Sequence, residues 1–407
     1  MNGSSSIRTS YDSIAFTVLE IYTILYLVGS HIFNSVMQGL FIVLCVATLL
    51  LLFKRYVLIS GYTKYMGLFI LFAFISTMWA ADKGSAMASN MVFLRCALWG
   101  FCVYVQANSK ERINKLLICF LIGTIVLDAY CLSVLGINGI LRLASQELRL
   151  GIESGTYLNS NYIGSINAIA TLIGVYLTIS HKRKIAVVSS LICAAFVLLS
   201  ASRGAVIALA FGIVLYALFA KSDNKLFRIP LYVGLGVIAV LIAYNVGLLN
   251  FVLDRFQVAS NSIKIFLSGD RTSNASNIRL RLIFVGLSLF AKRPLLGYGS
   301  GQFNRLISGI LGFAYSPHNA YIQSMVGYGV MGLYLWQGMY IRILFNSFKN
   351  RKDGLAMIVF VIICAWLIHD MFDHSISNKS SYFFLAIGFS SLSVLKNEDL
   401  ANQEVMV

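Results

Sequence analysis

The residue types best suited to chemistry lie in short polar segments between long apolar runs. Pro317-His318-Asn319 puts an imidazole at the expected start of a helix, where the helix dipole disfavours the imidazolium cation. A neutral imidazole can act as a general base, and a capping or interfacial histidine is the alternative interpretation. Arg203 lies in the turn SASRGAV, which is too short to carry its guanidinium far from a membrane surface.

The segment HDMFDHS (369–375) contains a further group of titratable residues. If it is helical, the spacing puts Asp370, Asp373 and His374 on one face, at positions i, i+3 and i+4. A metal site there would still lack ligands, and the sequence offers no Cys/His cluster elsewhere. We therefore expect neither a metal ion nor another cofactor.

The elements that carry these residues must cross a membrane. Of the 407 residues, 58% are hydrophobic and only 12% are charged, against about 45–50% and about 25% in soluble globular domains. Several apolar runs reach the roughly 17–25 residues that a helix needs to span a bilayer. This composition excludes a soluble enzyme, a disordered chain and a disulfide scaffold, and it predicts an all-α polytopic membrane protein.

The order of the apolar runs predicts about twelve transmembrane helices. The predicted spans are residues 14–29, 36–53, 65–81, 86–106, 116–135, 161–180, 185–201, 204–220, 229–249, 319–345, 355–373 and 381–396. Lys and Arg concentrate in alternate loops between these spans, and basic residues in short loops stay cytoplasmic. The pattern predicts that both termini are cytoplasmic. It also accounts for part of the net charge of +16 without a nucleic-acid partner.

The predicted topology makes residues 1–407 a single integral membrane domain and puts one long loop, residues 250–318, outside. Basic residues in this loop far outnumber acidic ones. Long loops escape the positive-inside rule, so this charge reflects either a solvated face near anionic lipid or an anion-binding site. Within the loop, residues 279–293 have basic ends and an apolar centre, which predicts an interfacial helix. Residues 294–303, PLLGYGSGQF, predict a turn because they combine Pro with three Gly.

Five segments on the external side follow one another in an order typical of one family. They are Trp79-Ala80-Ala81-Asp82, Gly155 to Asn161 (GTYLNSN), Ser202-Arg203-Gly204, Arg279 followed by Pro294 to Gly299 (PLLGYG), and His318-Asn319 followed after nine residues by Gly329-Val330-Met331-Gly332. Together they resemble the motifs W-S-x-D, G-x-x-x-N-x-N, S-R-G, R…PLLGxG and H-N-x9-G-x-x-G of the O-antigen ligase/O-antigen polymerase family of bacterial envelope glycosyltransferases. Ala80 replaces the family's Ser, and the choice of Arg279 over Arg281 rests on spacing alone.

The resemblance implies a GT-C-like fold and a metal-independent, inverting glycosyltransferase. The donor would be a glycan on undecaprenyl diphosphate. Arg203 and Arg279 would stabilise the leaving diphosphate, because guanidinium matches phosphate with two donors. His318 would orient or deprotonate the acceptor hydroxyl. Further substrate contacts are expected from Arg281, Asn159, Asn161, Asn319 and Arg293.

The resemblance leaves the acceptor open. A ligase transfers the glycan to lipid A–core, whereas a polymerase transfers it to another polyprenyl-linked chain. The H-N-x9-G-x-x-G match favours the ligase, and the polymerase is the alternative. A flippase or transporter is a third interpretation, which the clustering of unusual residues on the external side disfavours. The expected location is the bacterial inner membrane, among membrane lipids, with the active site facing the periplasm.

Overall fold

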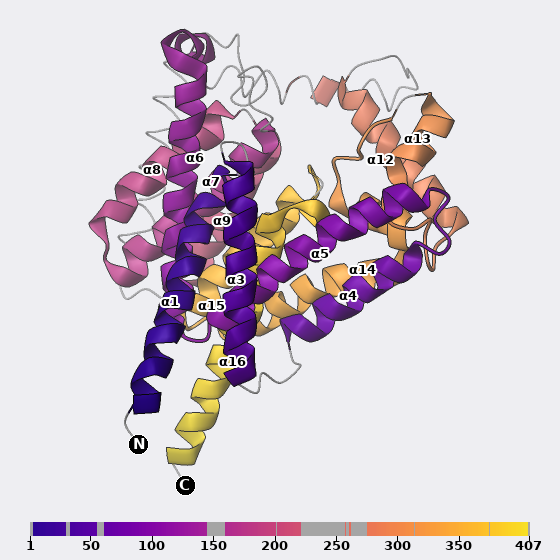
Figure 1. Cartoon of the computed structure of the whole chain (residues 1–407). Coiled ribbons are helices and arrows are strands. Elements are labelled where there is room, and N and C mark those ends of the chain that lie inside the picture. The colour runs from indigo at the N-terminus through magenta and orange to yellow at the C-terminus, as the bar shows by residue number, and fades with distance from the viewer. Residues whose placement is uncertain are drawn as a thin grey trace.

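The computed structural model describes residues 3–29, 33–54, 61–144, 159–200, 202–220, 257, 260–261, 275–312, 314–373 and 375–405. Every regular element within these ranges is a helix (Figure 1). The long helices are α1 (Gly3–Leu25), α3 (Asn34–Lys54), α4 (Tyr62–Ser76), α5 (Lys83–Gln106), α6 (Lys110–Ala144), α7 (Ser160–His181), α8 (Lys184–Leu199), α9 (Arg203–Phe219), α12 (Ala275–Lys292), α13 (Phe303–Leu311), α14 (Ala320–Lys349), α15 (Gly354–His369) and α16 (Lys379–Val405). A short 3₁₀ turn, η1, spans Ser375–Ser377.

The apolar runs of the sequence coincide with these helices. Each predicted span overlaps one helix, except residues 229–249, which lie outside the described residues. Residues 279–293 lie almost wholly within α12, and residues 294–301 form the predicted turn. The all-helical prediction is confirmed for the described part of the chain.

Four of the described helices are long and apolar enough to cross a membrane: Asn34–Leu52, Lys83–Gln106, Lys110–Gly136 and Ser160–His181. Shorter apolar helices follow at Tyr62–Ser76, Lys184–Leu199, Arg203–Phe219 and Gly354–His369. Large apolar side chains on the outside of the bundle are exposed, including Ile185 and Phe345. An extensive exposed apolar surface is typical of a protein in contact with lipid. The chain is a multi-pass membrane protein.

The centre of the bundle is formed by α7 and α15. Helix α7 packs against α8, α9 and α15, and α15 packs against α9, α14 and α16 as well. Because α15 is apolar around its whole circumference, it is stable only when other helices surround it. Large buried rings from neighbouring helices complete this core, among them Trp99, Trp336 and Trp366.

The two ends of the bundle differ in chemistry. At one end Lys110 Nζ lies 2.9 Å from Asp353 Oδ2 and 2.6 Å from Glu398 Oε2, which joins the starts of α6 and α15 to the C-terminal part of α16. Both chain termini lie at one end of the molecule, and α12 and α13 lie near the opposite end (Figure 1). The loops that contain Lys110 and Asp353 carry the basic clusters that the charge pattern assigns to one side of the membrane.

Candidate active site

His318 immediately precedes the cap of α14. Asn319 is the N-cap residue, and its Oδ1 accepts a hydrogen bond of 3.0 Å from the Ile322 N–H. The helix therefore begins at Ala320, directly after the His318-Asn319 pair that was expected to open it. His318 adopts the left-handed region with φ 45°, which is uncommon for a residue other than Gly.

Three hydrogen bonds tie the start of α14 to the end of α15. Asn319 Nδ2 donates to the Met371 carbonyl at 3.1 Å, and the Ala320 N–H donates to the Asp370 carbonyl at 2.8 Å. The Tyr321 hydroxyl donates to the Leu367 carbonyl at 2.9 Å. These bonds fix the position of His318 relative to the turn at residues 370–373. Asn319, predicted to bind substrate, has its amide engaged in this structural role.

Asp373 is the residue around which the site is arranged. Its Oδ1 lies 3.7 Å from His318 Nδ1, and its Oδ2 lies 3.6 Å from His369 Nε2. Both separations are ion-pair distances and exceed those of a hydrogen bond. The carboxylate is buried. A buried carboxylate beside an imidazole is the arrangement that orients a histidine base.

The expectation that residues 369–375 continue as one helix is wrong. Helix α15 ends at His369, where the chain turns, so Asp370 and Asp373 do not continue the helix. His374 lies outside the described residues. No three His, Cys, Asp or Glu side chains of the described ranges form a group that could hold a metal ion. Sequence reasoning missed the partnership of Asp373 with two histidines, although the i, i+4 spacing of His369 and Asp373 pointed to half of it.

Arg279, on α12, interacts electrostatically with the same carboxylate. Burial lowers the pKa of its guanidinium, and the nearby Asp373 and Tyr315 act in the opposite direction. The side chain is half-buried, whereas Arg281 is exposed. Two residues apart on a helix, the two side chains point to nearly opposite sides. Of the two arginines, Arg279 is the one beside the His318–Asp373 pair.

The turn that contains Arg203 packs directly on the turn at residues 370–373. Ser202 caps α9, because its hydroxyl accepts a hydrogen bond from the Ala205 N–H at 3.4 Å. A Cβ added at Gly204 would lie 2.8 Å from the Phe372 side chain. Only a residue without a side chain permits this approach, which brings Arg203 to the segment that holds Asp373.

The remaining predicted site residues make other contacts. Asn159 caps α7, and its Oδ1 accepts a hydrogen bond of 2.9 Å from the Asn161 N–H, while Gly155 to Leu158 lie outside the described residues. The Arg293 guanidinium lies 4.8 Å from the centre of the Tyr298 ring. Arg293 follows the last residue of α12, about 20 Å along the helix from Arg279. The structure does not bring it to the His318–Asp373 pair.

The glycine-rich segment 294–301 docks against a kink in α14. The Tyr298 N–H donates to the Val326 carbonyl at 2.9 Å, and the Val330 N–H donates to the Pro294 carbonyl at 2.8 Å. The kink is at Gly329, whose φ is 65°. A Cβ at Gly329 would contact the Leu295 carbonyl. Two of the sequence motifs, PLLGYG and G-x-x-G, therefore act together to hold the turn against α14.

The W-A-A-D turn at residues 79–82 supports this segment from the other side. Gln302 Nε2 donates to the Asp82 carbonyl at 2.8 Å, and the Asp82 N–H donates to Gln302 Oε1 at 2.9 Å. The Ser300 N–H donates to Ser76 Oγ at 3.1 Å. These contacts assign the tryptophan motif a structural role in positioning the loop.

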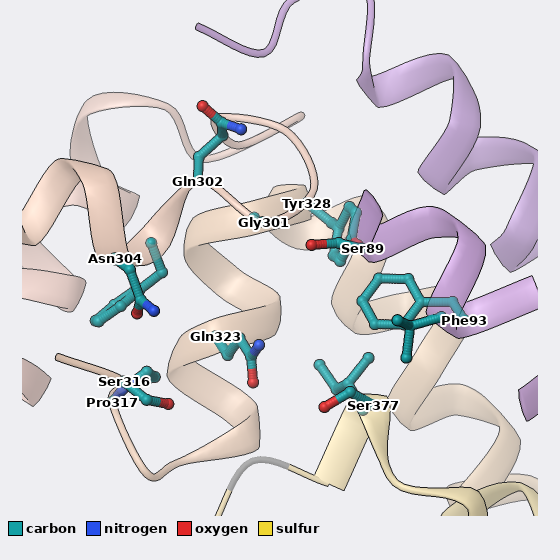
Figure 2. Close-up of a pocket in the computed structure, with 14 residues that line it drawn as sticks. Ser89, Phe93, Gly301, Gln302, Asn304, Ser316, Pro317, Gln323, Tyr328 and Ser377 are labelled. Carbon is teal, nitrogen blue, oxygen red and sulfur yellow. The ribbon is translucent and has the colours of Figure 1, made fainter. Parts of the chain in front are cut away.

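A pocket of about 240 Å³ lies between α5 and α14, next to the His318 segment (Figure 2). It is bounded by residues 301–304, which lead into α13, by residues 316–317 and by residues 376–377. His318, Arg203 and Arg279 are not among the residues that line it. The site thus has two parts, a charged centre around Asp373 and a separate pocket beside it.

The comparisons with known proteins agree with the sequence motifs. A family model described as O-antigen ligase matches residues 188–337. This range includes Arg203, Arg279 and His318, and it ends before Asp373. No curated protein matches the chain. The match covers less than half of the chain, and it confirms the predicted resemblance to the O-antigen ligase/polymerase family.

Proposed function

We propose that the chain transfers a glycan from undecaprenyl diphosphate to an acceptor hydroxyl during surface polysaccharide assembly. The observation that carries this proposal is the pairing of His318 with Asp373, 3.7 Å apart, beside the half-buried Arg279. A base and cations next to each other are what the reaction needs, because a hydroxyl loses a proton while a diphosphate leaves with additional negative charge.

In the proposed reaction His318 acts on the acceptor. Its Nδ1 faces Asp373, so the carboxylate favours the tautomer with a proton on Nδ1 and a lone pair on Nε2. Nε2 takes the acceptor proton as the acceptor oxygen bonds to the anomeric carbon. The bond between that carbon and the diphosphate oxygen breaks, and the electron pair leaves with the diphosphate. One displacement of this kind inverts the anomeric configuration.

In the same reaction Arg203 and Arg279 act on the donor. Each guanidinium can bind two phosphate oxygens and stabilise the charge that develops on them. Arg279 approaches from α12, and Arg203 from the turn that packs on Phe372. We propose that these two cations take the place of a divalent metal. Arg281 and Arg293 are exposed, and we assign them at most contacts with the outer part of the glycan or with lipid.

The proposed setting is the periplasmic face of the bacterial inner membrane. The chain would form one membrane domain over residues 1–407, with about twelve spans, a GT-C-like arrangement and both termini in the cytoplasm. Residues 250–318 would form the large periplasmic loop. The concentration of basic residues in alternate loops supports this orientation. In this orientation His318 and Arg203 would lie on the periplasmic side, where we propose that the lipid-linked glycan is transferred.

The acceptor is proposed to be lipid A–core, which makes the protein an O-antigen ligase. The alternative is a polymerase that adds repeat units to another undecaprenyl-linked chain. The test is transfer by purified protein in proteoliposomes, with undecaprenyl-diphosphate-linked glycan as donor and with either acceptor supplied alone. Product on lipid A–core supports the ligase, and extended lipid-linked chains support the polymerase. Absence of product from both acceptors contradicts the proposed glycosyl transfer. Activity that requires magnesium or manganese after EDTA treatment contradicts the metal-free mechanism.

A further inference from the structure

The pocket between α5 and α14 is lined by neutral polar groups. Hydroxyls come from Ser89, Ser316, Ser377 and Tyr328, and amides come from Gln302, Asn304 and Gln323. Phe93 and Tyr328 supply aromatic surface (Figure 2). Among the described residues that line the pocket none is charged. A diphosphate needs cations, so this lining suits a different ligand.

From this lining we propose that the pocket binds one uncharged sugar ring of the acceptor, with Gln323 as the residue that holds it. The inference rests on the proposed glycosyl transfer and adds the specificity site for its acceptor. Sugar hydroxyls both donate and accept hydrogen bonds, as the serine and amide groups of the lining do. The Tyr328 hydroxyl is already hydrogen-bonded to Ser300 Oγ at 2.8 Å. Phe93 and Tyr328, both largely buried, add an apolar side to the lining.

The size of the pocket limits the ligand to a single ring. Its volume of about 240 Å³ is below the roughly 300–1,000 Å³ of pockets that take drug-sized molecules. An oligosaccharide would have to extend out of it. The terminal ring of an acceptor is therefore the part that enters.

Among the described residues of the lining, Gln323 has the one buried amide oxygen that lacks a partner. Its Oε1 is buried and makes no hydrogen bond within the described part of the chain. Gln302, in contrast, uses its amide to bind the backbone of Asp82. Figure 2 shows the Gln323 amide directed into the space between Ser377 and residues 301–304. A buried acceptor without a donor is costly, and a sugar hydroxyl would satisfy it.

The position of the pocket favours the acceptor, rather than the donor, as its ligand. Ser316 and Pro317 line it and lead directly to His318. Gln323 lies one turn after Asn319, and its N–H donates to the Asn319 carbonyl at 3.1 Å. A ring held by Gln323 would lie next to the histidine proposed to take the acceptor proton, while Arg279 interacts electrostatically with Asp373.

The first experiment measures binding without transfer. Purified full-length protein in detergent is mixed with methyl glucoside, methyl galactoside or methyl glucuronide, and saturation transfer to the ring protons is recorded by NMR. We expect saturation transfer to at least one neutral glycoside and much less to the glucuronide. Gln323→Leu should abolish the signal. Asn304→Leu should abolish it too, and because Asn304 is exposed on α13, this substitution leaves the core undisturbed. Gln38→Leu, at an exposed position of α3 outside the pocket, is the matched control.

The second experiment measures kinetics in the transfer assay. Gln323→Leu should raise the acceptor KM about tenfold, the effect of one lost hydrogen bond to a ligand, and should leave the donor KM unchanged. A rise in the donor KM instead, or equal saturation transfer in wild type and Gln323→Leu, overturns the inference. If glycosides bind as expected but wild-type protein transfers nothing, the proposed function fails and the sugar site stands.

Discussion

Asp373 Oδ1 lies 3.7 Å from His318 Nδ1, although one residue follows α15 and the other precedes α14. The hydrogen bonds from Asn319 and Ala320 to the carbonyls of Met371 and Asp370 hold the two segments in this register. The imidazole and the carboxylate are thus positioned by these two hydrogen bonds to the backbone of residues 370 and 371. Such an arrangement survives changes to either side chain, which makes both suitable for substitution.

His318→Ala should nearly abolish transfer. Loss of a general base typically costs about 10²–10⁴-fold in rate, and the backbone contacts of Asn319 and Ala320 remain in the variant. The measurement is the initial rate of glycan transfer in proteoliposomes. His181→Ala is the matched control, because His181 ends α7 and its contact is with Tyr176. A rate within a few-fold of wild type would remove His318 from the mechanism.

Asp373→Asn tests whether the carboxylate orients the imidazole. The substitution keeps the size of the side chain and removes the charge that faces His318 and His369. We expect a clear loss of kcat, smaller than that of His318→Ala, with little change in the acceptor KM. The double variant should be no slower than His318→Ala alone, since both changes act on one group. Additive losses would mean that Asp373 acts independently of His318.

Arg279→Ala should abolish transfer, and Arg281→Ala should retain most of it. Arg279 is half-buried beside Asp373, and Arg281 is exposed on the other side of α12. Arg279→Lys should rescue poorly, because an ammonium group cannot bind two phosphate oxygens in the geometry of a guanidinium. Complementation of surface polysaccharide in a deletion strain, with protein levels measured in parallel, provides the readout. An active Arg279→Ala variant together with an inactive Arg281→Ala variant would reverse the assignment.

The sequence predicted the local structure well because local structure follows from local patterns. Apolar runs of sufficient length became helices, and Pro294 with its following glycines became a turn. The relation of Asp373 to His318 was not predictable in the same way, since it depends on how α14 and α15 pack. The choice between Arg279 and Arg281 was partly predictable from the sequence. Arg279 precedes the buried Leu282 by three residues, so helical periodicity puts both on the same face of α12.

The segment at residues 369–375 shows where pattern reasoning failed. The i, i+3, i+4 spacing of its titratable residues suggested one helical face, but α15 stops at His369. The turn that follows offers its carbonyls at residues 370 and 371 to the start of α14. A helix through this segment would have used those carbonyls internally. The contact between this turn and α14 therefore competes with continuation of α15. The strength of that contact cannot be read from the sequence alone.

Gly329→Ala should destabilise the protein. Gly329 has φ 65°, and a Cβ there would contact the Leu295 carbonyl. A non-glycine residue in strained backbone costs about 1–3 kcal/mol, so we expect a lower Tm in detergent by differential scanning fluorimetry. Gly338→Ala, in the same helix with open space around its α-carbon, should raise stability by about 0.5–1 kcal/mol. Equal effects of the two substitutions would contradict the docking of residues 294–301 at the kink.

The orientation in the membrane can be tested at the two ends of the bundle. Lys110, Asp353 and Glu398 join three segments at one end, and the loops with basic clusters are expected to be cytoplasmic. Reporter fusions after Lys184 and after Lys352 should therefore give a cytoplasmic signal. A fusion near Ser300, in the segment that docks on the α14 kink, should give a periplasmic signal. The lipid-linked glycan is proposed to reach His318 from the periplasm, so a cytoplasmic signal near Ser300 would overturn both the orientation and the placement of the active site.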